Sequence, residues 1–464
     1  MEQLDDNIAD NLLVYQKDHA LNLIYILKHN ITALDASDTG TGKTFTAIAA
    51  CAQMKLKPII ICPKSVVSSW KKVCKIFNVK PFMVVNYETI KTGKYYVNGK
   101  RVECPYIKII NKCVDAKNDI EYKWLLNNDE FIFIFDEVHK CSNLNTLNGK
   151  LLYYTKNEEK YMLLLSATAA DDPDKFKLFF YILNFIDPKN VKEKNLLYGQ
   201  YMGIMYKWIL RDSKPMNRIH SMLYPTRASR IKIDVLGDLF PQTQIIAQPY
   251  TMETKRQNEI EKEYKNIADQ INQLKTKGKK DTGNILTVIL RARQKIELLK
   301  IPTFVELAND FIENGFSVVI FVNFTQTLKA LAKMLYTDCL IYGEQTADVR
   351  DKNINKFQEN KSKIIICNIK VGGIGISLHD QYGGHPRASL ISPTWDAIDL
   401  VQALGRIHRA GSKSKSLQRI IYTANTIEEK IAEKLQKNLK DINSLNNGDV
   451  DLTNIIFEKE RKKM

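Results

Sequence analysis

Short continuous apolar runs alternate along the chain with segments whose apolar residues recur at helical spacing. In the first 165 residues, the apolar runs lie at 31–36, 58–62, 82–86, 131–135 and 161–165. Residues 12–28 and 45–54 instead show the three- and four-residue spacing of helices. Because an uninterrupted apolar strand is buried on both faces, these runs are typical of the centre of a parallel sheet. The pattern predicts an α/β lobe.

A second alternation begins near residue 302. It predicts helices at residues 303–314 and 327–336, and strands at 317–322, 339–342, 363–367 and 388–392. Between the two alternations, helical patterns at 253–274 and 285–299 flank a lysine-rich turn, which favours an antiparallel helical pair. We therefore expect an α/β fold of two parallel-sheet lobes in tandem with a helical protrusion between them. The expected boundaries are a first lobe at 1–190, a linker and protrusion at 191–300, a second lobe at 301–440 and a tail at 441–464.

The first candidate for chemistry is the phosphate loop, residues 37–44, which read Ser-Asp-Thr-Gly-Thr-Gly-Lys-Thr between an expected strand and an expected helix. Glycines in this context let backbone N–H groups and a helix N-terminus surround phosphate oxygens. Lys43 is expected to reach the outer phosphates of a nucleoside triphosphate, and Thr44 to ligate Mg²⁺. The loop departs from G-x-x-x-x-G-K-[ST] at Ser37, which stands where the first glycine is usual.

Asp136 and Glu137 follow the apolar run at 131–135. Open α/β sheets bind ligands at the carboxyl ends of their strands, where these two carboxylates are expected to lie. The chemistry needs one acid to hold Mg²⁺ and a neighbour to orient the attacking water, and we assign these roles to Asp136 and Glu137. Gln16, upstream of the phosphate loop, carries an amide donor and acceptor that suit an adenine edge.

The second alternation contains an arginine cluster at Arg406 and Arg409. Residues three apart share one face of a helix, so both side chains are expected to point the same way. An arginine delivered to a γ-phosphate accelerates hydrolysis by ~10³ or more. On spacing alone, a solvated surface pair fits equally well. A glycine-rich turn at 370–377 also follows an expected strand.

The net charge and the cysteine pattern restrict the expected partner and cellular compartment. Lys and Arg number 68 against 52 Asp and Glu, and the net charge of +16 favours a polyanionic partner such as nucleic acid. The eight cysteines form no C-x-x-C pair, which indicates buried thiols in a reducing compartment and not disulfides or a zinc site. The acidic, polar start lacks the features of a targeting signal, and no apolar run approaches ~20 residues, so we expect an intracellular protein without a membrane partner.

Taken in order, these motifs resemble those of the superfamily 2 helicases and translocases, and within them the Swi/Snf branch of DNA-dependent ATPases. The resemblance runs from Tyr15 to about Leu439. It rests on the phosphate loop, on the residues after three expected strands, and on the arginine cluster with the helix that follows it. These motifs lie at residues 38–44, 61–65 with Trp70, 86–89, 402–411 and 426–431.

The resemblance implies ATP and Mg²⁺ as cofactors and assigns roles to individual residues. Gln16 would contact adenine, Asp136 the metal and Glu137 the hydrolytic water, while Arg406 and Arg409 would be arginine fingers. The remaining nucleotide-binding positions would be Asp38, Thr39, Gly40, Thr41, Gly42, Lys43, Thr44 and Gly375. Coupling would fall to His139, Ser166, Thr168 and Gln402. The nucleic-acid track would include Lys64, Ser65, Tyr87, Asn323, Gly372, Gly373 and Ser377.

Two departures from the Swi/Snf pattern keep alternatives open. Val138 replaces the alanine of Asp-Glu-Ala-His, and Ser166-Ala167-Thr168 stands where a Gly-Thr is usual. Ser-Ala-Thr is commoner in unwinding helicases. The first hypothesis is an ATP-driven translocase on double-stranded DNA. The alternatives are a strand-separating helicase or transcript-release factor, and a nucleic-acid-binding scaffold without turnover.

The resemblance also bears on partners and setting. A polymerase or another DNA-bound protein is a candidate partner, and a monomer can hold the whole catalytic set. We expect no appended reader module, as in compact enzymes of large DNA viruses or phages. The expected location is the nucleus, or the cytoplasm or virion for a virus-encoded protein.

Overall fold

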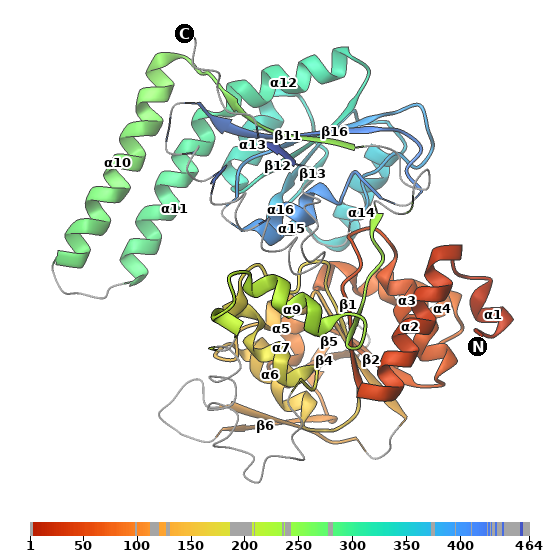
Figure 1. Ribbon diagram of the computed structural model, residues 1–464. Coiled ribbons are helices and arrows are strands. Elements are labelled where there is room, and N and C mark those ends of the chain that lie inside the picture. The colour runs from red at the N-terminus through yellow and green to blue at the C-terminus, as the bar shows by residue number, and fades with distance from the viewer. Residues whose placement is uncertain are drawn as a thin grey trace. The chain divides into compact units, whose positions relative to one another are not determined.

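Figure 1 shows the computed structural model of the 464-residue chain. It describes residues 3–97, 100–111, 120–126, 130–185, 207, 209–233, 236, 243–276, 282–372, 376–394, 396–409, 411–424, 426, 428, 432–433, 439 and 455–457. The chain divides into two compact units. The first comprises residues 1–236 and 440–452, and the second comprises 237–439 and 453–464. Residues 191–236, which we expected in the linker, thus belong to the first unit, and the helical pair belongs to the second.

The first unit is built on a six-stranded sheet in the order β10-β1-β9-β8-β2-β3. Every neighbouring pair in this sheet is parallel. The strands are β1 (Thr32–Asp35), β2 (Lys57–Cys62), β3 (Met83–Asn86), β8 (Phe131–Asp136), β9 (Tyr161–Leu165) and β10 (Ala228–Ser229). The five strands predicted in this part of the chain are confirmed.

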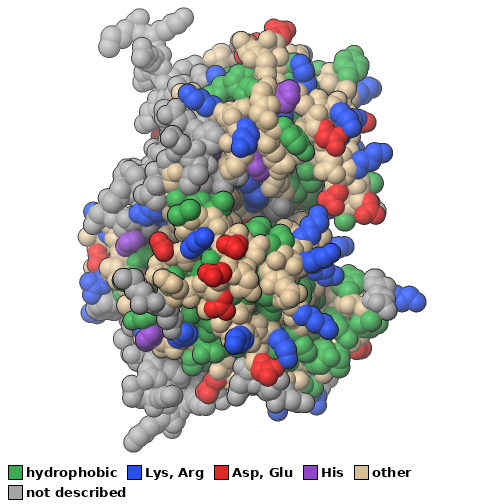
Figure 2. Space-filling view, turned by 90° about the vertical axis from the view of Figure 1, so that its right-hand side faces the viewer, with side chains coloured by type: hydrophobic (Ala, Val, Ile, Leu, Met, Phe, Trp, Pro, Cys, Tyr) green, Lys and Arg blue, Asp and Glu red, His purple; other side chains and the backbone are tan. Residues whose placement is uncertain are grey.

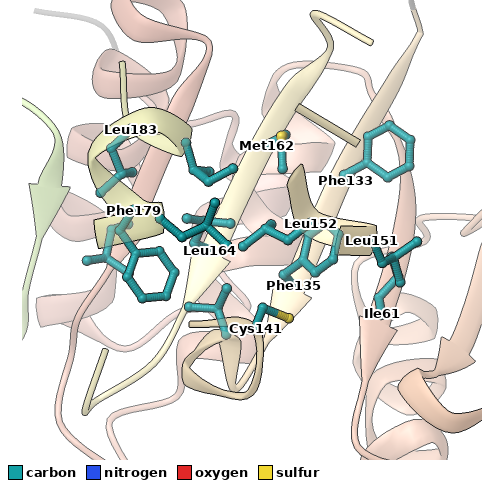
Figure 3. Packing of buried hydrophobic residues seen from close by; sticks show 14 of the residues in the cluster. Ile61, Phe133, Phe135, Cys141, Leu151, Leu152, Met162, Leu164, Phe179 and Leu183 are labelled. Atoms are coloured by element: carbon teal, nitrogen blue, oxygen red, sulfur yellow. The ribbon is translucent and has the colours of Figure 1, made fainter. Parts of the chain in front are cut away.

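Both faces of this sheet are covered, as the continuous apolar runs predict. Phe133 and Phe135 of β8 face one core, which α6 (Leu147–Lys156), α7 (Lys177–Ile182) and α9 (Pro215–Leu223) help to close (Figure 3). Ile132 and Ile134 face the other. That second core is closed by α1 (Asp6–Ala9), α2 (Val14–Asn30), α3 (Lys43–Gln53) and α4 (Val67–Ile76).

Two antiparallel ribbons lie between α5 (Tyr87–Ile90) and β8 in sequence, where no regular pattern was predicted. They are β4 (Lys94–Val97) with β5 (Lys100–Glu103), and β6 (Ile107–Asn111) with β7 (Ile120–Trp124). All four residues of β5 are exposed, so its sequence carries no apolar periodicity to detect. The second ribbon contributes Tyr122 and Trp124 to the core.

The second unit contains a seven-stranded parallel sheet in the order β13-β14-β12-β15-β16-β11-β17. The strands are β11 (Thr243–Tyr250), β12 (Ser317–Val322), β13 (Leu340–Ile341), β14 (Ile364–Asn368), β15 (Arg387–Ile391), β16 (Ser416–Thr423) and β17 (Ile455–Phe457). The helices are α12 (Ile301–Glu313), α13 (Thr325–Met334), α14 (Ala347–Gln358), α15 (Ile369–Gly372) and α16 (Ala397–Leu404). Strands β11 and β16 were not predicted, because polar residues interrupt their apolar positions, and β17 was not predicted because it is only three residues long.

The predicted helical pair is confirmed as α10 (Thr254–Thr276) and α11 (Thr282–Leu299), which lie side by side and extend from the sheet of the second unit (Figure 1). A small apolar cluster of Ile260, Tyr264 and Ile296 joins the two helices. Beside it, the buried Lys300 ammonium donates to both oxygens of the Glu428 carboxylate, at 2.9 and 3.2 Å. The chain therefore has the predicted α/β architecture of two parallel-sheet lobes with a helical protrusion.

Candidate active site

The strand order of the first unit brings the candidate residues of that unit to one edge of the sheet. All six strands point the same way, so the residues that follow them gather at their carboxyl ends. The phosphate loop follows β1, Ser166 follows β9, and Asp136 closes β8. The loops after β2 and β3 lie along the same edge and begin the segments that contain Lys64 and Tyr87.

The backbone conformation of the phosphate loop requires its two glycines. Gly40 and Gly42 adopt φ values of 93° and 92°, in the left-handed region that side chains disfavour. A Cβ atom at Gly42 would also lie 2.3 Å from Nε2 of Gln16. Helix α3 begins directly after Gly42, at Lys43, so its N-terminal N–H groups open toward the loop.

Gln16 supports the loop from α2. Its Nε2 donates to the Thr41 carbonyl at 2.8 Å, and its Oε1 accepts from the backbone N–H of Leu13 at 3.0 Å. The Tyr15 hydroxyl donates to the same Thr41 carbonyl at 3.2 Å. Gln16 is therefore placed beside the phosphate loop, as predicted, while its contact with adenine stays a prediction.

Lys43 lies within the loop that it is expected to serve. Its Nζ donates to the carbonyl oxygens of Ser37 at 2.7 Å and Asp38 at 3.2 Å. Burial lowers the pKa of the Lys43 ammonium, and the nearby carboxylates, Asp35 and Glu137 first among them, oppose that shift. These carbonyl contacts hold the ammonium at the loop, where phosphate oxygens would take over part of its coordination.

Asp136 is held at two points. The indole Nε1 of Trp70 donates to Asp136 Oδ2 at 2.9 Å, and the hydroxyl of Tyr87 donates to the Asp136 carbonyl at 2.8 Å. Burial, followed by repulsion from Glu137, raises the pKa of Asp136 to about 7, while Trp70 and Lys43 oppose the shift. A carboxyl group with such a pKa gains from a cation that neutralises it.

Glu137, His139 and Ser166 meet beside Asp136. Glu137 has a φ of 56°, an unusual value for a residue other than glycine, which turns the chain sharply at the end of β8. His139 Nδ1 lies 3.4 Å from Glu137 Oε2 and 3.1 Å from Ser166 Oγ. The Thr168 N–H donates to the same Ser166 hydroxyl at 3.2 Å. The structure thus brings together three of the four predicted coupling residues.

The donor set fits Mg²⁺ carried in with a nucleotide. Asp136 offers a carboxylate, and Thr44 offers a hydroxyl in the first turn of α3. Among the residues that the structure describes, no group of three or more His, Cys, Asp or Glu side chains could hold a metal ion. Mg²⁺ is commonly held by one or two protein ligands plus phosphates and water, which is the situation that Asp136 and Thr44 offer.

The predicted nucleic-acid residues of the first unit differ in exposure. Lys64 is exposed and Ser65 is partly exposed on the 3₁₀ turn Lys64–Val66, directly before α4. Tyr87 is fully buried, and its hydroxyl is bonded to Asp136. Trp70 and Tyr87 therefore connect the segments after β2 and β3 to Asp136. The spacing of residues in the sequence did not predict these hydrogen bonds to Asp136, although Trp70 was identified as part of a family motif.

In the second unit, the prediction that Arg406 and Arg409 share one face of a helix is wrong. Helix α16 ends at Leu404, and Arg406 and Arg409 lie in the turn beyond it. The guanidinium of Arg406 donates to the Ile376 carbonyl at 3.3 Å, and that of Arg409 donates to the Ser377 hydroxyl at 2.8 Å. Both arginines are thereby fixed to the last two residues of the glycine-rich turn at 370–377.

Other predicted residues of the second unit occupy varied positions. Gln402 is buried on α16. Gly372 ends α15, while Gly373 and Gly375 lie outside the described residues. The Asn323 side-chain amide donates to Glu297 Oε2 at 2.8 Å and to the Pro393 carbonyl at 3.1 Å. Asn323 is thus engaged in a polar network within its own unit, and its contact with nucleic acid stays a prediction.

Comparison with known proteins decides the family. Residues 15–300 match the SNF2-related domain, and residues 300–411 match the helicase conserved C-terminal domain. The chain belongs to the SNF2 family. It is accordingly a nucleic-acid-dependent ATPase with the two RecA-like lobes of superfamily 2, and the predicted resemblance is confirmed.

This SNF2-family chain is similar to several proteins whose names indicate a function. A protein of Acanthamoeba polyphaga mimivirus, named "Putative ATP-dependent RNA helicase", is 39% identical over 97% of this chain and 86% of the relative. The human SWI/SNF-related matrix-associated actin-dependent regulator of chromatin subfamily A member 1 is 23% identical over 90% of this chain, which spans 42% of that protein. A solved Sulfolobus solfataricus SWI2/SNF2 ATPase core in complex with dsDNA is 19% identical, covers 96% of each chain and has a TM-score of 0.37, a likeness that adds nothing to the assignment.

In the part of the chain that the structure describes, no helix combines the length and hydropathy that a bilayer crossing requires.

Proposed function

We propose that the protein is an ATP-driven translocase on double-stranded DNA. The observation that carries the proposal is the assembly of Lys43, Asp136 and Glu137 at one sheet edge, in a chain of a family of nucleic-acid-dependent ATPases. A relative of 23% identity is named as a regulator of chromatin, which supports DNA as the track. The net charge of +16 suits either nucleic acid.

In the proposed hydrolysis, each residue of the first unit has one task. Lys43 and the N–H groups of residues 40–44 bind the outer phosphates, and Gln16 reads the adenine edge. Asp136 and Thr44 hold Mg²⁺, which would offset the charge of the phosphates when bound. Glu137 orients the attacking water, and His139 with Ser166 relays the state of this site to the rest of the protein.

The second unit is proposed to supply Arg406 and Arg409 to the γ-phosphate, with Gly375 nearby. An arginine there stabilises negative charge that grows in the transition state. Because both arginines contact the segment at 376–377, a change in that segment would move them. The residues proposed to follow the nucleic-acid backbone are Lys64, Ser65, Asn323, Gly372, Gly373 and Ser377.

Charge on the surface does not by itself trace that path. On the face shown in Figure 2, lysine and arginine side chains are interspersed with acidic ones over both units. Binding measurements therefore have to locate the track, and variants of Lys64 are the direct probe because this side chain is exposed.

The test is ATP hydrolysis by the full chain without nucleic acid and with duplex DNA, single-stranded DNA, branched DNA or RNA. Duplex DNA should stimulate turnover the most, and K43A should abolish it in every case. Equal turnover with and without every nucleic acid would refute the proposal, as would a K43A protein with full activity. Absence of hydrolysis under all conditions would instead favour a scaffold without turnover.

A strand-separating activity, on RNA or DNA, is the second candidate. It is favoured by the mimivirus relative, whose name specifies an RNA helicase, and by the Ser166-Ala167-Thr168 sequence. A triplex-displacement assay beside a duplex-unwinding assay separates the two, because a translocase displaces a third strand and leaves the duplex paired. Release of a stalled polymerase in the same preparation would point to transcript release.

The mimivirus relative also supports a virus-encoded protein that acts in the cytoplasm or virion of an infected cell. Fractionation with an antibody to the full chain would test this location, and recovery in the nucleus alone would contradict it.

A further inference from the structure

The segment at residues 227–233, here called the connecting segment, runs beside the phosphate loop. It contains β10, which pairs with β1 at the edge of the first sheet. The pairing continues past both strands: the Ala36 N–H donates to the Ser229 carbonyl at 2.9 Å, and the Asp38 N–H donates to the Ile231 carbonyl at 3.0 Å. The first residues of the phosphate loop are thus hydrogen-bonded to a segment almost 200 residues away in sequence.

Side chains strengthen this pairing at Asp38. The Arg230 guanidinium donates to Asp38 Oδ1 through Nε, at 3.1 Å, and through Nη2. The backbone N–H of Ile233 donates to the other carboxylate oxygen at 2.9 Å. The side chains of Arg230 and Asp38 are 9% and 21% exposed, so water screens the pair less than it would a surface ion pair.

Ser37, the residue that replaces the first glycine of the loop, serves the same connection. Its hydroxyl accepts from the Ile231 N–H at 2.9 Å and lies 3.1 Å from Nε2 of His19. The other ring nitrogen of His19 lies 3.0 Å from the Ser229 hydroxyl. A glycine at position 37 could make neither of the two contacts of the Ser37 hydroxyl. The departure from the usual loop pattern therefore fastens the loop to the connecting segment.

Asp38 also touches the catalytic machinery. Its carbonyl accepts from Lys43 Nζ at 3.2 Å and from the Thr41 hydroxyl at 2.8 Å. A shift of Asp38 would therefore change the position of the lysine that binds the outer phosphates. The connecting segment itself ends close to Gly237, where the second unit begins. Force on the chain between the two units would reach Asp38 through Arg230 and Ile233.

We propose that Arg230 is a positioning residue that ties the phosphate loop to the connecting segment and so couples ATP hydrolysis to displacement of that segment. The pair acts mainly on the rate of hydrolysis, because a small shift of Lys43 misaligns the phosphate for attack, whereas the other binding groups of the loop stay in place. The inference rests on the proposed function in one respect, namely that nucleic acid is the stimulus that moves the segment.

Arg227 provides the matched control. It lies on the same segment, but its guanidinium donates to the carbonyls of Leu183 and Asn184, at 3.1 and 3.2 Å, and not to the phosphate loop. R227A and R230A therefore remove the same side chain from one segment, and they differ in whether the loop loses a contact.

The experiment measures kcat and KM for ATP with and without duplex DNA, the Kd of a fluorescent ADP, and the melting temperature, all on the full chain. In R230A, the ratio of stimulated to unstimulated kcat should fall about tenfold, a typical size for coupling between two sites. The Kd of ADP should change by less than about threefold. A larger loss of affinity would mean that Arg230 contributes to nucleotide binding itself, which the proposal excludes. R230K should recover part of the ratio, because an ammonium can still bind Asp38.

A double-mutant cycle with D38N locates the effect in the pair. The D38N/R230Q protein should lose no more stimulation than either single variant, because the two residues act as a unit. If R230A and R227A show the same stimulation ratio, or if the D38N and R230Q effects add fully, the coupling role is refuted. A wild-type protein that no nucleic acid stimulates would refute the proposed function instead, so the two failures are distinguishable.

Discussion

The two units share an architecture but use their strand ends differently. In the first unit, side chains at the sheet edge hold one another: Lys43 binds the loop carbonyls, Trp70 binds Asp136, and His139 contacts Ser166. In the second unit, Arg406 and Arg409 are bonded to the segment at 376–377. The first edge gathers the groups that we propose bind the nucleotide, while the two arginines of the second unit are fixed to its glycine-rich turn. Similar sheets thus carry different sets of side chains at their strand ends.

Buried polar groups show the same contrast. In the first unit, His19 and Asp35 are buried beneath the phosphate loop, where burial would raise the pKa of Asp35 but the His19 charge and hydrogen bond lower it overall. In the second unit, the buried acids Glu297 and Glu428 lie at the base of the helical pair, where they accept from Asn323 and Lys300. The first network lies beneath the phosphate loop, and the second joins helices to a sheet.

The largest expected effect comes from the arginines of the second unit. R409A should lower kcat by ~10³, because the charge that develops on the γ-phosphate loses its stabilising cation. Nucleotide affinity should stay within a few-fold of wild type, since the first unit holds the binding groups. Single-turnover hydrolysis and fluorescent ADP binding measure the two effects.

R419A is the control for R409A, because Arg419 of β16 donates to the Tyr250 hydroxyl in the same unit. Loss of nucleotide binding in R409A, with a substantial residual rate, would overturn the division of labour between the two units.

At the first edge, E137Q should lower hydrolysis by ~10²–10³, which lies within the contribution of ~10²–10⁴ that is typical of a general base. Binding should survive, because the phosphate loop is intact and the amide keeps the shape of the side chain. Equilibrium ATP binding beside a burst assay makes the measurement. A normal rate of hydrolysis in E137Q would show that another group orients the attacking water.

Trp70 offers a sharper test of how the first edge is assembled. W70F keeps an aromatic ring but removes the indole N–H that donates a hydrogen bond to Asp136. A hydrogen bond to a charged group is worth roughly 1.5–3 kcal/mol. We expect kcat to fall at least about tenfold at low Mg²⁺ and to recover partly at high Mg²⁺, because the bond orients the proposed metal ligand. A Mg²⁺ titration of the ATPase rate measures this.

W124F is the matched control, since the Trp124 indole donates to the Thr155 hydroxyl at 2.9 Å in the core on the other face of the same sheet. It should lower the melting temperature without altering the Mg²⁺ dependence. Identical Mg²⁺ profiles for W70F and W124F would show that Trp70 only packs.

The smallest expected effect is on stability. The pKa of Asp136 is about 7, well above its usual value of 3.8, so the folded protein holds this proton more tightly than the unfolded chain. Stability from this group is complete below pH ~4 and is lost as the pH rises through ~7. D136N should therefore raise the melting temperature at pH 8 by about 2–4 °C, and the gain should vanish near pH 4. Thermal unfolding without Mg²⁺ or nucleotide tests this, and a D136N protein less stable at pH 8 would contradict it.

The sequence by itself determined the class of fold, the family and the residues of the phosphate loop. Continuous apolar runs reveal central strands because such strands have no solvent face, and the glycines of the loop are required by local backbone geometry. The ribbons at 94–124 and strands β11 and β16 were missed, because their apolar residues are interrupted by polar ones and their stability comes from pairing with distant strands. The end of α16 before Arg406 was missed as well, although Gly405, the residue that caps the helix, is of the type that commonly ends one.

Only the tertiary structure decided which distant side chains complete the site. Trp70 reaches Asp136 because β2 and β8 are neighbours in the sheet, and Arg230 reaches Asp38 because β10 lies beside β1. The order of parallel strands cannot be read from their apolar patterns, which are alike. Ser37 shows the consequence most clearly: the sequence marks it as a departure from the loop pattern, and its hydrogen bonds to His19 and the connecting segment give that departure a physical reason.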